Sequence, residues 1–218
     1  ARTIRPKINK CLQDYLIEFK PTKIKKPSLK TRVSGLDLSD TKALTKKLSL
    51  DKSVLPVSGF FTGGTSKAKK LFKEFLINRF ERYAENSNQP QTDDISHMSP
   101  YLHFGQISPV YLALQVRDAR EGQGIDRAAY LEELIVRREL ALNFVWYTPD
   151  YDRYACLPDW ARKTLAEHAG DDRPRIYDRE TLENAATHDP YWNAAMREMV
   201  HTGFMHNTMR MYWGKKIL

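Results

Sequence analysis

Apolar residues recur at helical spacing along most of this chain. Ile4, Ile8 and Leu12 lie about one turn apart near the start, and phenylalanines and leucines form a second stripe over residues 66–83. Almost no segment alternates apolar and polar residues as a half-buried strand would, so the pattern predicts a mainly α fold. We expect helices over residues 1–20, 66–83, 128–147, 162–168, 181–186 and 190–202, and a further helix that begins at Ser108-Pro109.

Residues 21–58 differ in kind from the rest of the chain. They are rich in lysine, contain Pro21, Pro27 and Pro56, and hold few large apolar residues. We expect an exposed connection there, with at most one short helix around residues 36–48.

The composition indicates which partners and which cellular compartment fit this protein. The 218 residues hold 35 Lys and Arg against 27 Asp and Glu, a formal net charge of +8. A polyanionic partner such as a nucleic acid fits this charge, and a basic protein with no nucleic-acid role is the alternative. The two cysteines, Cys11 and Cys156, are far apart in the sequence, which indicates a reducing compartment and not a disulfide scaffold. No apolar run reaches membrane-spanning length.

Glu133 and Arg137 are four residues apart on the predicted long helix, with the acid first. This order favours a helical ion pair, which contributes about 0.3–0.5 kcal/mol when it is exposed. The alternative interpretation places both side chains at the rim of a pocket, where the guanidinium meets a phosphate or a planar ring and the carboxylate meets a base edge. Spacing alone leaves both interpretations open.

The segment from Ile95 to Ser99 combines two hydroxyls with backbone N–H groups ahead of an apolar stretch. Such a turn can grip a phosphate, although an ordinary capped turn has the same pattern.

The sequence contains no motif of the common metal, nucleotide-binding or serine-nucleophile sites. His201 and His206 are five residues apart and have no cysteine partners, so no metal site is expected. The chain also contains no Gly-rich dinucleotide loop, no Walker sequence and no Gly-x-Ser-x-Gly turn.

The stretch 202–218 combines aromatic, polar and basic side chains on one predicted helix. Asn207, Arg210 and Trp213 occupy nearby positions on it, and no glycine, asparagine or proline stop signal follows. A helix with this chemistry usually borders a ligand, and we expect part of the ligand site to lie beyond Leu218.

Four blocks of the sequence resemble one known family. Their order and spacing look like those of the class II cyclobutane pyrimidine dimer photolyases, within the photolyase/cryptochrome family. The likeness runs from about Gly63 to the end of the chain and is less distinct before it. The blocks are residues 132–140, 158–165, 187–195 and 210–218.

The resemblance implies a domain organisation. Residues 1–20 would be the end of an N-terminal α/β antenna domain, and residues 21–58 would be an interdomain linker. Residues 59–218 would form an FAD-binding and DNA-binding helical domain that is incomplete at its C-terminal side.

The resemblance also implies roles for single residues. Glu133 and Met211 match positions that contact the flipped-out dimer. Trp213 and Trp192 match electron-relay tryptophans, with Trp213 nearer the flavin and a third member expected beyond the end of the chain. His97 stands where related photolyases often have arginine. The residues that match FAD-binding positions are Tyr83, Ile95, Ser96, His97, Met98, Ser99, Arg137, Asn207 and Arg210.

The implied activity is light-dependent repair of cyclobutane pyrimidine dimers, by electron transfer from photoexcited, fully reduced FAD to the dimer. The enzyme would be a carbon–carbon lyase that acts as a monomer on UV-damaged DNA, away from membranes. It would work in the nucleoid region of a prokaryotic cytoplasm or in a eukaryotic nucleus. The resemblance leaves room for an antenna chromophore in a preceding domain without identifying one, and this piece alone is expected to be inactive.

Two other functions stay open. A cryptochrome-like flavin photoreceptor would share the fold and the cofactor without repairing DNA. A cofactor-free, basic helical module that binds nucleic acid would explain the charge but not the four sequence blocks. A (6-4) photolyase has less support, because its paired catalytic histidines are not evident around residues 204–207.

Overall fold

The computed structural model describes residues 4–20, 22–23, 25, 35–57 and 59–217. Within these ranges the chain forms helices and turns and no strand, which confirms the mainly α prediction. The elements are α1 (Ile4–Tyr15), α2 (Thr41–Lys46), α3 (Thr65–Asn78), η1 (Phe80–Arg82), α4 (Tyr83–Asn86), α5 (Ser99–His103), α6 (Pro109–Arg117), α7 (Gly124–Leu131), η2 (Glu132–Arg137), α8 (Arg138–Tyr147), η3 (Tyr154–Cys156), α9 (Asp159–Glu167), α10 (Arg179–Glu183), α11 (Pro190–Thr202) and α12 (Asn207–Ile217).

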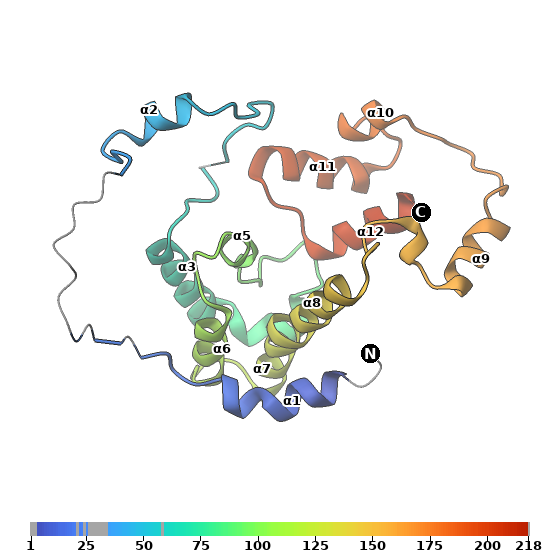
Figure 1. The fold of residues 1–218 in the computed structure, drawn as a ribbon. Coiled ribbons are helices and arrows are strands. Elements are labelled where there is room, and N and C mark those ends of the chain that lie inside the picture. Colours follow the sequence, from blue (N-terminus) through green and yellow to red (C-terminus); the bar gives the residue numbers. More distant parts are fainter. Residues whose placement is uncertain (1–3, 21, 24, 26–34, 58, 218) are drawn as a thin grey trace.

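The helices form a central group with smaller units around it. The turn η2 contacts α6, α7 and α8, and α6 also contacts α7. Helix α1 packs against η2 and α8 at one end of this group (Figure 1). Helices α11 and α12 pack against each other on the opposite side, and α9 and α10 lie beyond them (Figure 1).

Local sequence signals set several helix ends. The carboxylate of Asp189 accepts hydrogen bonds of 3.0 and 3.2 Å from two backbone N–H groups in the first turn of α11. Gly203, at φ 72°, ends the same helix in the left-handed conformation. At α6 the hydroxyl of Ser108 accepts a 3.4 Å hydrogen bond from the N–H of Tyr111, and Pro109 follows it at the first helical position, as predicted.

The predicted helix over residues 1–20 is wrong at its C-terminal end, and its first three residues lie outside the described ranges. Helix α1 ends at Tyr15. Ile17 and Phe19 beyond it are 64% and 88% exposed, so no packing holds them in a helix. Pro21 in the sequence also disfavours helical conformation in the residue before it.

Two more predicted helices differ in detail. The helix predicted over residues 128–147 exists, but its middle is a turn of π-helix, η2, which joins α7 to α8. The helix predicted over residues 66–83 is divided, because α3 ends at Asn78 and the short turns η1 and α4 carry the chain onward. The short helix expected around residues 36–48 is α2, whose first turn is capped by the carboxylate of Asp40.

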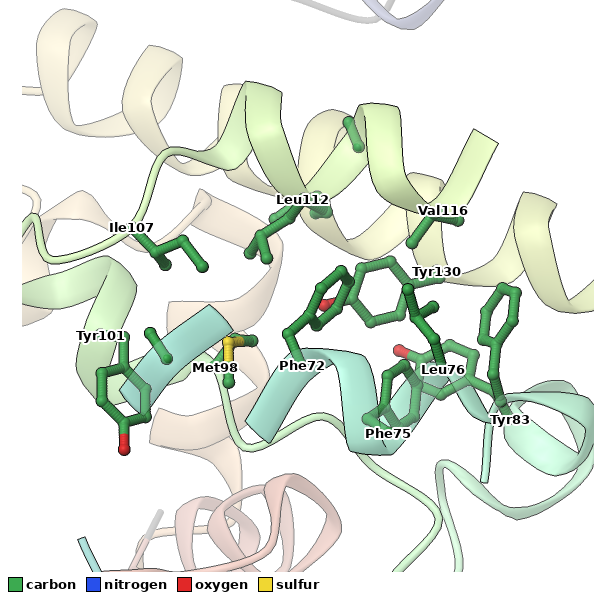
Figure 2. Packing of buried hydrophobic residues seen from close by; sticks show 14 residues of the cluster. Phe72, Phe75, Leu76, Tyr83, Met98, Tyr101, Ile107, Leu112, Val116 and Tyr130 are labelled. Carbon is green, nitrogen blue, oxygen red and sulfur yellow. The ribbon is translucent and has the colours of Figure 1, made fainter. Parts of the chain in front are cut away.

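The core is an aromatic cluster between α3 and α7. Phe72, Phe75 and Phe80 are at most 1% exposed. The ring of Tyr130 lies 5.7–6.3 Å from each of these three rings. Figure 2 shows Tyr130 beside Phe72 and Phe75. Burial of one such side chain contributes about 1.5–3 kcal/mol, and well-oriented aromatic pairs add about 0.5–1.5 kcal/mol. This cluster therefore fixes α7 against α3.

Gly122 lies beside this cluster and allows a prediction. Its φ is 77°, and a Cβ atom added there would lie 2.7 Å from the ring of Phe80. We expect Gly122→Ala to lower the free energy of unfolding by about 2 kcal/mol, measured by urea denaturation, because it adds backbone strain and overpacks the core.

Gly124→Ala is the matched control. Gly124 is the first residue of α7, and a Cβ atom there meets nothing within 4 Å. Its substitution should leave stability within about 1 kcal/mol of the original protein. Equal destabilisation by the two variants would contradict the packing assigned to Gly122.

Candidate functional site

A cavity of about 510 Å³ opens beside the aromatic core. Its walls come from four separate parts of the chain: α4, the turn that leads into α5, the junction of α7 with η2, and the start of α12 with the loop before it. Hydroxyls, amides, two histidines, two carboxylates and a guanidinium line it. The residues expected from the sequence to form a site that line this cavity are Tyr83, Ile95, Ser96, His97, Met98, Ser99, Glu133, Asn207 and Arg210.

The turn that carries Ser96 is anchored from both sides. The hydroxyl of Tyr130 donates a 3.1 Å hydrogen bond to the Oγ of Ser96. Met98, two residues on, is only 2% exposed and belongs to the hydrophobic core. The turn therefore presents its polar groups to the cavity from a fixed position.

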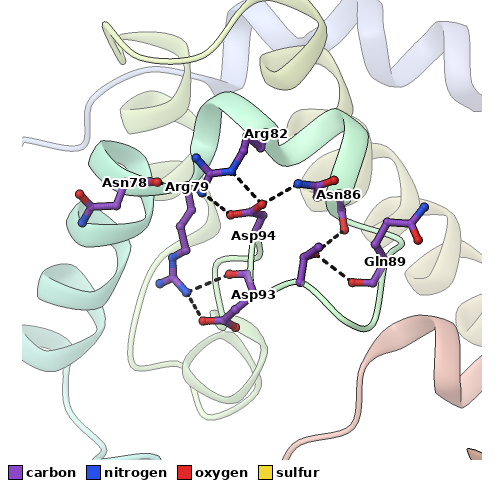
Figure 3. Close-up of polar contacts among 8 residues, drawn as sticks. Asn78, Arg79, Arg82, Asn86, Gln89, Asp93 and Asp94 are labelled. Carbon is purple, nitrogen blue, oxygen red and sulfur yellow. Dashed lines mark hydrogen bonds and ion pairs between the residues drawn. The ribbon is translucent and has the colours of Figure 1, made fainter.

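Asp94 ties this turn to α4. It accepts hydrogen bonds of 3.0 and 2.7 Å from the guanidinium of Arg82 and one of 2.7 Å from the amide of Asn86 (Figure 3). These hydrogen bonds, chiefly the one from Arg82, hold the pKa of Asp94 below its ordinary value, although burial acts in the opposite direction. The carboxylate stays ionised and holds the start of the turn in place.

Two buried tyrosines form the floor of the cavity. The rings of Tyr83 and Tyr130 meet edge to face, with centroids 5.1 Å apart. Burial raises the pKa of Tyr83 to about 12, with a smaller contribution from the carboxylate of Glu133. Burial also raises the pKa of Tyr130. Both phenols are therefore neutral hydrogen-bond donors at neutral pH.

The π-helical turn η2 brings acidic side chains to the cavity. Single π turns inside α-helices occur often at functional sites. Glu132 and Glu133 line the cavity, while Nε of Arg137 lies 3.7 and 3.8 Å from their carboxylate oxygens. Arg137 itself is absent from the cavity lining, and its side chain is 61% exposed. The Glu133–Arg137 pair is thus an ion pair that also borders a pocket.

Basic groups gather at the part of the cavity near α12. His206 is 3% exposed, and its pKa is lowered by burial, then by the charge of Arg210 and by His97. His97 contacts the ring of Phe204 edge to face at 4.9 Å. The Nδ1 atom of His97 is buried and has no hydrogen-bond partner among the described residues.

Two tryptophans stack next to this region. The rings of Trp192 in α11 and Trp213 in α12 are 4.3 Å apart and within 14° of parallel. Trp192 is 5% exposed, and its Nε1 donates a 3.0 Å hydrogen bond to the carbonyl of Leu182. The two rings form one continuous aromatic unit between the helices.

Asp189 holds α11 and α12 together around this stack. Besides capping α11, its carboxylate accepts a hydrogen bond from the hydroxyl of Tyr212 and lies 3.4 Å from Nζ of Lys216. Burial alone raises the pKa of Asp189, but these hydrogen bonds and those of the cap outweigh it, so the pKa is lowered overall. The ionised carboxylate of Asp189 therefore holds α11, which carries Trp192, and α12, which carries Trp213, together.

Comparison with known proteins gives the family. The deoxyribodipyrimidine photo-lyase of Methanothermobacter thermautotrophicus is 46% identical over 219 residues, which covers 100% of this chain and 46% of that protein. The enzyme of the same name from Oryza sativa is 42% identical over 223 residues, covering 100% of this chain and 44% of that protein. The chain belongs to the photolyase/cryptochrome family.

A solved structure and further relatives agree with this family, and the match covers only part of each relative's length. A bacterial class III photolyase crystal structure from Agrobacterium tumefaciens shares the fold, with a TM-score of 0.65 at 22% identity over 84% of this chain and 36% of that one. Proteins named cryptochrome match at lower identity. No family model matches the chain. The chain spans less than half the length of the two photo-lyases.

Within this photolyase/cryptochrome chain, four of the expected site residues lie outside the cavity lining. Arg137 is one, and Met211 on α12 is another, with 51% of its surface exposed. Trp192 and Trp213 are together but do not line the cavity either. Sequence reasoning missed Tyr130, Phe204 and His206 as lining residues. For Tyr130 the signal was present, because it shares a helical stripe with Glu133.

The described ranges contain no group of three or more His, Cys, Asp or Glu side chains that could hold a metal ion. A search of the same residues finds no helix with the length and apolar character needed to cross a bilayer.

The Asp94 network predicts a pH-dependent stability. We expect Asp94→Asn to lower the free energy of unfolding at neutral pH by about 2 kcal/mol, the scale of a hydrogen bond between charged groups. Because the folded-state pKa is lowered, this stabilisation is complete above about pH 4, the ordinary value for aspartate, and is lost as the pH falls through the folded-state pKa. Urea denaturation at about pH 7 and pH 3 measures it.

Asp118→Asn is the control for Asp94→Asn. Asp118 also pairs with an arginine, Arg117, but both side chains are more than half exposed, so its loss should change stability little at either pH. A deficit of Asp94→Asn that is the same at both pH values would contradict the assignment.

Proposed function

We propose that the full-length protein to which this chain belongs repairs cyclobutane pyrimidine dimers in DNA with light. This chain would supply part of the domain that binds FAD and damaged DNA. The observation that carries the proposal is that the cavity gathers eight of the nine expected FAD-binding residues together with Glu133, beside a stacked tryptophan pair. Tyr83 and Arg210, the first and last of these residues, are 127 positions apart in the sequence, so no local sequence pattern brings them together.

The cavity residues fit a cofactor that carries phosphates and a ring system. Ser96 and Ser99 offer hydroxyls, Asn207 offers an amide and Arg210 offers a guanidinium. The buried Nδ1 atom of His97 is a polar group that a ligand would satisfy, since buried polar atoms rarely lack a partner. Reduced FAD, when bound, supplies the photoexcited electron that splits the dimer.

The chain's own residues would bind and orient the substrate. Glu133 has its carboxyl group at the cavity wall and 56% exposed, so it can reach a flipped-out base edge while Arg137 neutralises its charge. Met211, exposed on α12, would pack against the lesion. Lysine and arginine side chains around the opening would hold the DNA backbone, so binding should weaken as salt is raised.

The tryptophan pair would provide an electron route through the protein. The two rings stack directly, with centroids 4.3 Å apart. The hydrogen bond from Tyr212 of α12 to Asp189, the cap of α11, holds the two helices together. This route would serve flavin reduction and not the repair step itself.

The domain assignment is part of the same proposal. Residues 1–20, which contain α1, would end an antenna domain that holds a second chromophore. Residues 21–58 would be the linker, and residues 59–218 the incomplete helical domain. The protein would act as a monomer wherever its DNA lies, in the nucleoid or the nucleus.

A cryptochrome-like photoreceptor is the second candidate, because proteins named cryptochrome match at lower identity. The greater likeness to photo-lyases favours repair. Illumination of the purified full-length protein with dimer-containing DNA separates the two. We expect a yellow protein that removes thymine dimers under blue light and not in darkness. A yellow protein with no repair under light would favour the photoreceptor, and equal repair in darkness would contradict both.

The electron route predicts a separable defect. Trp213→Phe in the full-length protein should strongly slow photoreduction of oxidised flavin, followed by its absorbance, because the remaining tryptophan loses its stacked partner. Repair by chemically pre-reduced enzyme should persist. The control is Trp160→Phe, since Trp160 is 74% exposed on α9 and should affect neither step. Loss of both activities in Trp213→Phe would show a structural role instead.

A further inference from the structure

A second cavity, of about 350 Å³, lies beside the stacked tryptophans. It shares no lining residue with the cavity of the candidate site. Its volume falls within the range of small-ligand pockets, about 300–1,000 Å³. We call it the basic cavity, because three cationic side chains line it beside three rings: Arg173, Arg175, Lys216, Tyr177, His188 and Trp192.

Helix α12 runs from one cavity to the other. Asn207 and Arg210 near its start line the candidate site, and Lys216 near its end lines the basic cavity. At 1.5 Å of rise per residue, Asn207 and Lys216 are about 14 Å apart along the helix axis. Trp213 lies on the helix between them and stacks on Trp192, which itself lines the basic cavity. Trp192 is therefore the member of the pair that a ligand in the basic cavity would meet.

The positive charge of this cavity is only partly compensated. Lys216 lies 3.4 Å from the carboxylate of Asp189, so these two charges offset each other. The guanidinium of Arg173 donates to three backbone carbonyls within residues 168–171, at 3.1–3.4 Å. Among the described residues, no carboxylate pairs with Arg173 or with Arg175. The cavity therefore attracts an anion.

Hydrogen bonds fix the aromatic walls of the basic cavity. The rings of Tyr177 and His188 are stacked with centroids 5.7 Å apart and planes within 19°. The Tyr177 hydroxyl is hydrogen-bonded to Nδ1 of His188 and accepts a 3.0 Å hydrogen bond from the backbone N–H of the same residue. Flat rings beside guanidinium groups suit a planar organic anion, because the guanidinium fork matches a pair of anionic oxygens.

The tryptophan pair needs a supply of electrons. We propose that the basic cavity binds a small, planar organic anion, such as an enolate reductant, that returns one electron to Trp192. The inference rests on the proposed function, in which light-driven flavin reduction draws an electron from the pair by way of Trp213. The bound anion loses one electron and becomes a neutral radical, while the radical cation of Trp192 becomes neutral tryptophan. Charge and electrons balance in this step.

The same charges favour release of the oxidised ligand. Before the step, the anion is attracted by Arg173 and Arg175. After the step, the ligand is neutral and that attraction is lost, so it dissociates and leaves the cavity to a fresh anion.

The test follows the decay of the tryptophan radical after a light flash, in full-length protein with oxidised FAD and without oxygen. Ascorbate, an enolate anion, is the probe, and the ionic strength is held constant. We expect the decay rate to rise with ascorbate concentration and to reach a plateau, because the electron moves within a bound complex. Hydroquinone, an uncharged reductant, should give a rate that rises linearly.

Two arginine variants locate the site. Arg175→Gln should raise the ascorbate concentration for half-maximal rate about tenfold, because it removes one charged partner of the anion. The matched control is Arg179→Gln, since Arg179 is four residues away, 89% exposed and outside the cavity lining. It should leave the half-maximal concentration unchanged.

Binding can also be measured without flavin. Isothermal titration calorimetry of the full-length apoprotein should show ascorbate and benzoate, a planar carboxylate that does not donate electrons, competing for one site. Both should bind about tenfold more weakly to Arg175→Gln and normally to Arg179→Gln.

The outcomes separate this inference from the proposed function. If light produces no tryptophan radical in the FAD-loaded protein, the proposed function fails, and calorimetry still shows whether the cavity binds the anion. If the radical forms but its decay rate rises linearly with ascorbate, or if Arg175→Gln and Arg179→Gln behave alike, the inference is overturned. Competition by undamaged DNA for the ascorbate site would assign the cavity to the DNA backbone and overturn it as well.

Discussion

Tyr130 joins the core of this protein to its cavity. Its ring packs with Phe72, Phe75 and Phe80, while its hydroxyl donates to Ser96 at the cavity wall. Burial of the ring raises the pKa of the phenol, so the hydroxyl keeps the hydrogen that it donates to Ser96. The position of the Ser96 turn therefore depends on the same packing that stabilises the fold, and a disturbance of the core would move the polar groups of the cavity as well.

The cavity has two electrostatically different ends. Glu132 and Glu133 line it where α7 passes into η2, whereas His97 and Arg210 line it near α12. A ligand with an anionic part and a neutral hydrogen-bonding part would align between them, with the anion toward the basic end. The π-helical turn contributes to this polarity, because it places two consecutive glutamates at the wall while Arg137 stays on their outer side.

Much of the fold could be predicted from the sequence, and the site only in part. Helical periodicity and the Ser108-Pro109 start are local signals, and they correctly indicated helices. The π turn was not predictable, because its sequence has the same periodicity as an α-helix over six residues. The FAD contact of Arg137 was expected from the family resemblance, yet Arg137 does not line the cavity and its side chain is 61% exposed. Stacking of Trp192 on Trp213 requires two helices to cross at one point, which no local pattern encodes.

Asp189 shows how one residue can connect local structure to function. As the cap of α11 it is specified by nearby sequence, but its second oxygen bonds Tyr212 and lies near Lys216, both on α12. Tyr212 and Trp213 are neighbours in sequence, and Trp192 lies in the turn that Asp189 caps. The carboxylate is thus bonded to the helix of each tryptophan within a few residues of the ring. Since a parallel stack is sensitive to small helix displacements, a charged clamp at this point restricts the motion that would separate the rings. The geometry of the aromatic pair is therefore set by a polar interaction outside the pair and not by ring contact alone.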